Sequence, residues 1–170
     1  MKLYHGSDIS VSVPLAGIGR DRVDFGQGFY LTALRVQAIS WAQTIASRHR
    51  GAQAILNQYE FDRQAAMADC GIRYKVFASY DKEWLDYVVD CRRGGRLQHR
   101  FDVVEGGVAN DNVIDTVEDY ENGMITATQA LGQLAYKKTN QQLCIRSQVV
   151  LDLRLQFIRS VVLRNDCSKE

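Results

Sequence analysis

The chain has 170 residues, 46% of them hydrophobic and 24% charged, which suits one domain with an ordinary buried core. Lysine and arginine number 21 against 20 acidic residues, so the formal charge of +1 excludes a strong overall field toward nucleic acid or membranes. No apolar run approaches the roughly 20 residues of a membrane span, and the first residues, MKLYHGSD, lack an apolar signal segment. We expect a cytoplasmic protein, without membrane contact, that forms one domain over residues 1–170.

The predicted elements follow one another in mixed order. In the first half, the pattern predicts a strand over residues 2–6, a loop over 7–24, a strand over 29–31, a helix between Thr32 and Gly51, a strand over 54–61, a weak helix over 63–69 and a strand over 74–78. In the second half, it predicts a helix from Asp81 to Gly94, a strand over 101–104, a helix from Asn110 or Asp111 to Gly123, a helix from Thr126 through Lys137, a strand over 142–147, a helical turn over 149–155 and a strand over 157–163. Because the strands do not alternate strictly with helices, the order favours an α+β fold with antiparallel or mixed sheets.

Metal sites and charged patches are weakly indicated. The four cysteines form no C-x-x-C pair and the three histidines do not cluster with them, so we expect reduced thiols and no metal. The densest positive group is Arg92, Arg93 and Arg96. Such a group can bind an anion, but a solvated loop after a helix is the favoured interpretation.

Residues 24–32, DFGQGFYLT, place two glycines just before a short strand. The stretch lacks the third glycine of a dinucleotide-binding fingerprint, and no Gly-Lys-Ser or Gly-Lys-Thr of a P-loop occurs. Glycine lets the backbone approach a ligand closely. Alternation along the strand turns Phe29 and Leu31 to the core and Tyr30 to an open face, where a planar cation such as nicotinamide can stack. From spacing alone, a turn that merely opens a strand remains the alternative.

Two segments, YHGS at 4–7 and GFYLT at 28–32, together resemble the ADP-ribosyltransferase superfamily, in its diphtheria-toxin-like branch with a His-Tyr-Glu signature. The runs QAISWA, YEFD, EWLDYVV, FDVVEGGVANDNV and QQLCIRSQ extend the likeness over most of the chain, toward an uncharacterised bacterial domain family within that superfamily. The resemblance implies split, mixed or antiparallel sheets around an NAD cleft, with several helices.

The resemblance also implies roles for individual residues. His5 would hydrogen-bond a ribose hydroxyl of NAD, the Gly6 backbone would hold the nicotinamide carboxamide, and Tyr30 would stack on the nicotinamide ring. Arg22, or Arg20 beside it, would meet the pyrophosphate. Catalysis falls to His5, Tyr30 and Gln148. The residues expected to contact NAD are His5, Gly6, Ser7, Arg22, Gly28, Phe29, Tyr30 and Thr32.

The third signature position departs from the family, which carries Thr-Glu where this chain has Ser147-Gln148. A carboxylate there would bind the ribose 2′-hydroxyl and stabilise the positive charge that develops as the glycosidic bond breaks. Gln148 has no charge, and losing one such partner costs roughly 10²–10³ in rate, while NAD binding suffers less. Three explanations stay open: an engineered replacement, which the isosteric change favours; a natural slow enzyme or one with another catalytic group; and a pseudoenzyme.

The implied function is mono-ADP-ribosyl transfer from NAD to a macromolecule, either protein or nucleic acid. A small bacterial protein of this kind would be a toxin of a toxin–antitoxin or defence system, with a small cognate antitoxin as its partner. One alternative is an inactive module that binds NAD or ADP-ribose. Another is a different NAD reaction, such as hydrolysis or transfer of a 2′-phosphate. The polar segment 137–142, KKTNQQ, is a candidate for the loop that reads the acceptor.

Overall fold

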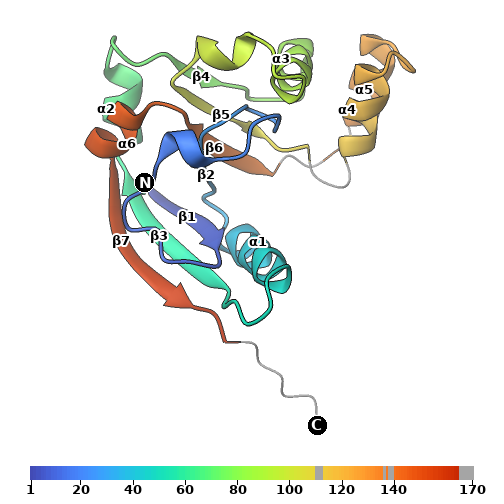
Figure 1. The fold of residues 1–170 in the computed structure, drawn as a ribbon. Helices are drawn as coiled ribbons and strands as arrows, with labels where there is room; N and C mark the ends of the chain where they lie inside the picture. The colour runs from blue at the N-terminus through green and yellow to red at the C-terminus, as the bar shows by residue number, and fades with distance from the viewer. Residues whose placement is uncertain (110–112, 136, 138–139, 165–170) are drawn as a thin grey trace.

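The computed structural model describes residues 1–109, 113–135, 137 and 140–164. The predicted helix start at Asn110 or Asp111, and Lys138 and Thr139 of the candidate acceptor loop, lie outside these residues. Within them, the chain forms two β-sheets and six α-helices, which confirms the α+β class (Figure 1). None of these helices is both long and apolar enough to cross a membrane.

The elements agree with the predicted order. The strands are β1 (Lys2–Ser7), β2 (Phe29–Leu31), β3 (Ile55–Phe61), β4 (Tyr74–Val76), β5 (Val103–Gly107), β6 (Gln141–Ile145) and β7 (Leu155–Val162). The helices are α1 (Arg35–Ser47), α2 (Arg63–Ala68), α3 (Lys82–Arg92), α4 (Ile114–Glu121), α5 (Ala127–Leu134) and α6 (Gln148–Arg154), with short 3-10 turns η1 (Ala16–Ile18) and η2 (Leu97–Arg100). Two boundaries matter below: β6 ends at Ile145, and Gln148 begins a helix instead of lying on the strand.

The strands form two separate sheets that adjoin at one bridge. Sheet A has the order β1-β3-β7 and is antiparallel throughout. Sheet B has the order β2-β6-β5-β4, in which only the β4–β5 pair is parallel. The backbones of Tyr4 and Thr32 exchange hydrogen bonds of 2.8 and 2.9 Å, which links β1 to β2. The strands are therefore divided between one antiparallel sheet and one mixed sheet, in agreement with the predicted antiparallel or mixed sheets.

Two hydrophobic cores fill the layers between these elements. The first, the helix-side core, lies between sheet B and helices α3, α4 and α5, and includes Trp84, Leu85 and Val104. The second, the shared core, takes Leu3 and Tyr59 from sheet A together with apolar residues of sheet B. Figure 1 shows sheet A and α1 in the lower half of the molecule, and sheet B with α3, α4 and α5 in the upper half.

Candidate functional site

His5 lies near the end of β1, and its ring packs against Phe29 with 4.6 Å between the ring centroids. Its Nδ1 is 2.8 Å from the backbone carbonyl oxygen of Tyr30. Because a carbonyl only accepts hydrogen bonds, Nδ1 carries the proton of the neutral ring and Nε2 keeps a lone pair. Burial lowers the pKa of His5 from 6.5, which favours this neutral form. The two sequence segments that carry the family resemblance thus meet at His5.

Gly6 and Ser7 are held by local packing. A Cβ on Gly6 would overlap the carbonyl oxygen of Ala38 and lie 2.7 Å from the backbone nitrogen of Ala42, so glycine lets α1 pack directly on β1. Ser7 is buried, and its hydroxyl accepts a hydrogen bond of 3.3 Å from the backbone N–H of Ile9. The contacts of both residues with NAD stay predictions.

Asn57 on β3 is a residue whose role the sequence pattern did not reveal. It is 0% exposed. Its Oδ1 accepts from the Val11 backbone at 2.9 Å and from the Ser160 hydroxyl at 2.6 Å, while its Nδ2 donates to the carbonyls of His5 and Ile9 at 3.4 and 3.2 Å. This amide therefore holds the backbone on both sides of Gly6 and Ser7. Its only signal in the sequence was a polar residue on the apolar face of a strand.

Tyr30 faces away from Phe29 and Leu31, as predicted, but its face of sheet B is not open. The ring packs against the helix-side core. Its hydroxyl donates to the Gly26 carbonyl at 2.6 Å and accepts from the Phe25 N–H at 3.1 Å. Burial raises the pKa of Tyr30 well above 10.0. In this state of the protein, Tyr30 closes the turn that precedes its own strand instead of offering a free ring.

Internal packing accounts for both glycines of DFGQG. Gly26 has a φ of 73°, which favours glycine, and a Cβ on Gly28 would lie 2.5 Å from the Cys144 sulfur. Asp24 is anchored at the start of the stretch, where it pairs with Arg92 at 3.1 Å and accepts from the Ala109 N–H at 2.8 Å. Burial raises the pKa of Asp24 in spite of these partners.

Gln148 uses its whole amide to attach α6 to the loop before η1. Its Oε1 accepts from the Ala16 N–H at 3.0 Å, and its Nε2 donates to the Pro14 carbonyl at 3.1 Å and to the Asp152 carboxylate at 2.8 Å. A glutamate here would place a second carboxylate against Asp152 and would have no donor for Pro14. The contacts of this position therefore suit an amide.

Thr32 ties three elements together. Its side chain is buried, donates to the Gln37 side chain at 3.0 Å and lies 3.1 Å from the Gln141 carbonyl. Arg22 is exposed, with a φ of 52°, and its Nε lies 3.7 Å from where a Cβ on Gly94 would stand. Arg22 thus lies on the turn after α3.

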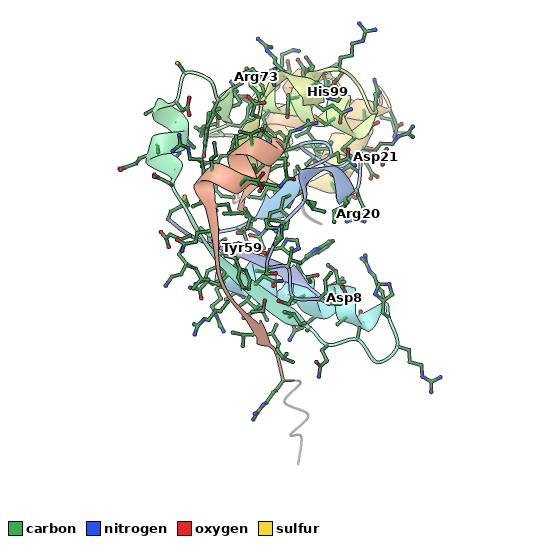
Figure 2. All side chains as sticks on the ribbon, turned by 60° about the vertical axis from the view of Figure 1, so that its left-hand side comes forward. Asp8, Arg20, Asp21, Tyr59, Arg73 and His99 are labelled. Atoms are coloured by element: carbon green, nitrogen blue, oxygen red, sulfur yellow. The ribbon has the colours of Figure 1, made fainter. Side chains whose placement is uncertain are left out.

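Trp41 on α1 is a large aromatic residue that remains 41% exposed. The guanidinium groups of Arg20 and Arg48 each lie 5.7 Å from its ring centroid. Close by in the chain, His49 pairs with Asp8 at 2.8 Å, and the hydrogen bond from His49 lowers the pKa of that carboxyl. In the view of Figure 2, the label of Arg20 stands above that of Asp8.

Two pockets lie elsewhere on the surface. One, of about 770 Å³, is lined by residues of β3, α2, α6 and the start of β7, including Arg63, Asp152 and Arg154. The other, of about 520 Å³, lies between the end of α1, the residues just before β3 and the end of β7. Neither contains His5, Tyr30 or Gln148. Across the described ranges, no group of three or more His, Cys, Asp or Glu side chains is placed to hold a metal ion.

Comparison with known proteins identifies a family without an assigned activity. The model of the family described as "Protein of unknown function (DUF3990)" matches residues 1–157. This match covers most of the chain, which therefore belongs to that family. Neither the curated proteins nor the solved structures gave a match.

Proposed function

We propose that this member of the DUF3990 family has an ADP-ribosyltransferase-like fold and transfers ADP-ribose from NAD to a macromolecular acceptor. The observation that carries the proposal is the 2.8 Å contact between His5 Nδ1 and the Tyr30 carbonyl, because it joins the two segments on which the family resemblance rests. They meet beside the Tyr4–Thr32 bridge, where sheets A and B adjoin. NAD would bind there, between the sheets.

His5 would position the ribose. Its Nδ1 is already used by the Tyr30 carbonyl, and its lowered pKa keeps the ring neutral, so Nε2 offers a lone pair to a ribose hydroxyl. In the reaction, the bond from ribose C1′ to nicotinamide breaks and nicotinamide leaves with the electron pair. An acceptor nucleophile then bonds to C1′ and releases its proton. A held ribose helps because the acceptor must approach C1′ in one orientation.

In this proposal, the absence of a carboxylate at Gln148 slows the transfer of ADP-ribose. The same absence favours a second candidate function. No charge at position 148 stabilises the developing cation, and the amide is held by Pro14, Ala16 and Asp152. The second candidate is therefore a module that binds NAD or ADP-ribose without turnover. In either case, the family resemblance favours a bacterial toxin–antitoxin or defence setting with a small cognate antitoxin.

A binding measurement tests the shared part of both candidates. We expect NAD to bind the unmodified chain in titration calorimetry, and His5→Gln to weaken binding about tenfold, the effect of one hydrogen bond of roughly 1.4 kcal/mol. His49→Gln is the matched control, since His49 is exposed and contacts Asp8. The absence of NAD binding in the unmodified chain, or equal loss in both variants, would reject the proposal.

A transfer measurement separates the enzyme from the module. Bacterial lysate is incubated with labelled NAD and either the chain, its Gln148→Glu form, or Gln148→Glu with Asp152→Asn. The double variant removes the carboxylate that Gln148 contacts, so the new glutamate is free of that repulsion. We expect weak labelling by the chain and labelling about 10²–10³ times faster by the double variant. If all three forms bind NAD and none of them labels an acceptor, the transferase is excluded and the non-catalytic binding module is supported.

A further inference from the structure

Exposed arginines lie on three segments of the protein that contact one another at Trp41 and at Gly94. The guanidinium groups of Arg48 and Arg20 each lie 5.7 Å from the ring centroid of Trp41. Arg22 follows two residues after Arg20 and rests on the turn at Gly94, and Arg96 comes directly after this turn. We call Arg48, Trp41, Arg20, Arg22 and Arg96 the arginine strip.

The strip carries positive charge that the rest of the molecule does not neutralise. Among the residues that the structure describes, these four arginines take part in no ion pair. Two carboxylates lie at the strip: Asp21 is exposed within it, and the carboxylate of Asp90 lies against Gly95 and accepts from the Leu97 N–H at 2.7 Å. The four guanidinium groups therefore outnumber the nearby carboxylates by two. The strip therefore attracts anions locally, although the whole chain has a formal charge of only +1.

The arginine group that the sequence singled out divides in two. Arg92 pairs with Asp24 and Glu118, and Arg93 pairs with Glu121, so both help to hold α3 to its neighbours. Arg96 is exposed and belongs to the strip. The expected solvated loop thus contains one cation that is available to a ligand and two that are used within the fold.

We propose that the arginine strip binds single-stranded nucleic acid, with the arginines on its phosphates and a base stacked on Trp41. The inference names the acceptor class of the proposed transferase and rests on that function. Single-stranded nucleic acid is typically held by cationic grooves with interleaved aromatic rings, because every base has a face that can stack. An acidic polypeptide would use the arginines but not the indole, which is 41% exposed.

Fluorescence anisotropy with a short labelled single-stranded RNA tests the inference. We expect a dissociation constant in the range of about 10⁻⁶–10⁻⁴ M, weakening as salt rises from about 50 to 200 mM, as for a few neutralised phosphates. Arg48→Glu with Arg96→Glu should lower the affinity at least about tenfold. The control is Lys2→Glu with Arg159→Glu, the same charge change on exposed residues of β1 and β7, which should keep the affinity within about twofold. An abasic strand of equal length should bind about fivefold or more weakly to the unmodified chain and equally to Trp41→Ala.

The outcomes separate this inference from the proposed function, because NAD binding is measured on the same samples. If the unmodified chain does not bind RNA, or if both charge variants lose the same RNA affinity, the proposal that the arginine strip binds nucleic acid is wrong, even where NAD binds. Equal competition by polyglutamate overturns nucleic acid in favour of an acidic protein, and equal binding of the abasic strand overturns the stacking of a base on Trp41. RNA binding that depends on the strip, in a chain that does not bind NAD, overturns the transferase and with it the acceptor role.

Discussion

Burial and one hydrogen bond together set the protonation state of His5. The Tyr30 carbonyl accepts from Nδ1, and desolvation opposes a second proton on Nε2. The ring is thus prepared as an acceptor in the folded protein, before any ligand binds. This property belongs to a single residue, but it depends on β2 lying beside β1.

The lowered pKa of His5 predicts how stability changes with pH. Since the folded pKa lies below 6.5, the unfolded chain takes up this proton first as the pH falls, and the free energy of unfolding decreases from about pH 6.5 downward. Above that range His5 is neutral in both states and contributes no slope. Urea unfolding at about pH 7.5 and pH 5.5 measures the effect. The stability of the unmodified chain should fall relative to His5→Gln between these pH values, and an unchanged difference would contradict the assignment.

The sequence motifs indicated which residues belong to the candidate site, but they did not indicate the contacts that these residues make. His5 and Tyr30 were singled out, and their contact follows from strand pairing. The partners of Gln148 were not predictable, because Pro14 and Ala16 are 134 and 132 residues away in the chain. No local pattern encodes a contact of that range. The closed environment of Tyr30 was hidden for the same reason, because its ring packs against the helix-side core, whose residues, such as Trp84 and Val104, lie far away in the chain.

At the scale of elements, helix caps and hydrophobic periodicity predicted the order of helices and strands along the chain. They predicted less well which faces of these elements pack against the rest of the fold. The Asp81 side chain accepts from the Trp84 N–H at 2.8 Å, and Thr126 and Gln129 form the predicted capping box. Gly106 and Gly107 are the last two residues of β5, beyond the predicted strand over 101–104. They are glycines because Phe77 and Tyr80 pack against their backbone. A pattern of single residues cannot distinguish such a glycine from a turn.

The contact between α1 and β1 predicts opposite effects for two glycine substitutions. Gly6→Ala would push a methyl group into the backbone of α1 at Ala38, so we expect a loss of about 2–3 kcal/mol of unfolding free energy. Gly132 lies in α5 with no atom within 4 Å of an added Cβ, so Gly132→Ala should gain up to about 1 kcal/mol. Urea unfolding compares the two. Stability equal to the unmodified protein in Gly6→Ala would mean that α1 does not lie this close to β1.

At the scale of the whole molecule, the shared core connects the two sheets. Leu3, Tyr59 and Phe61 of sheet A pack together with Phe29, Leu31, Val103, Leu143 and Ile145 of sheet B. Separating the sheets would expose these side chains to water at about 25 cal/mol per Å² of apolar surface. The split in hydrogen bonding is therefore not a split in packing. Under the proposed function, NAD would therefore bind beside this core, toward His5 and Gly6, because the core itself is filled.

This shared core predicts that both halves unfold in one transition. The two tryptophans serve different layers: Trp84 is 0% exposed in the helix-side core, and Trp41 lies on α1 beside sheet A. In Trp41→Phe, fluorescence reports on Trp84 alone, while circular dichroism reports on all helices and strands. We expect the same urea midpoint from both signals, since loss of either sheet exposes the part of the shared core that the other sheet supplies. A lower midpoint by circular dichroism than by Trp84 fluorescence would mean that sheet A and α1 unfold first. The NAD site would then lie between a stable layer and one that opens on its own, and ligand binding would raise the lower midpoint alone.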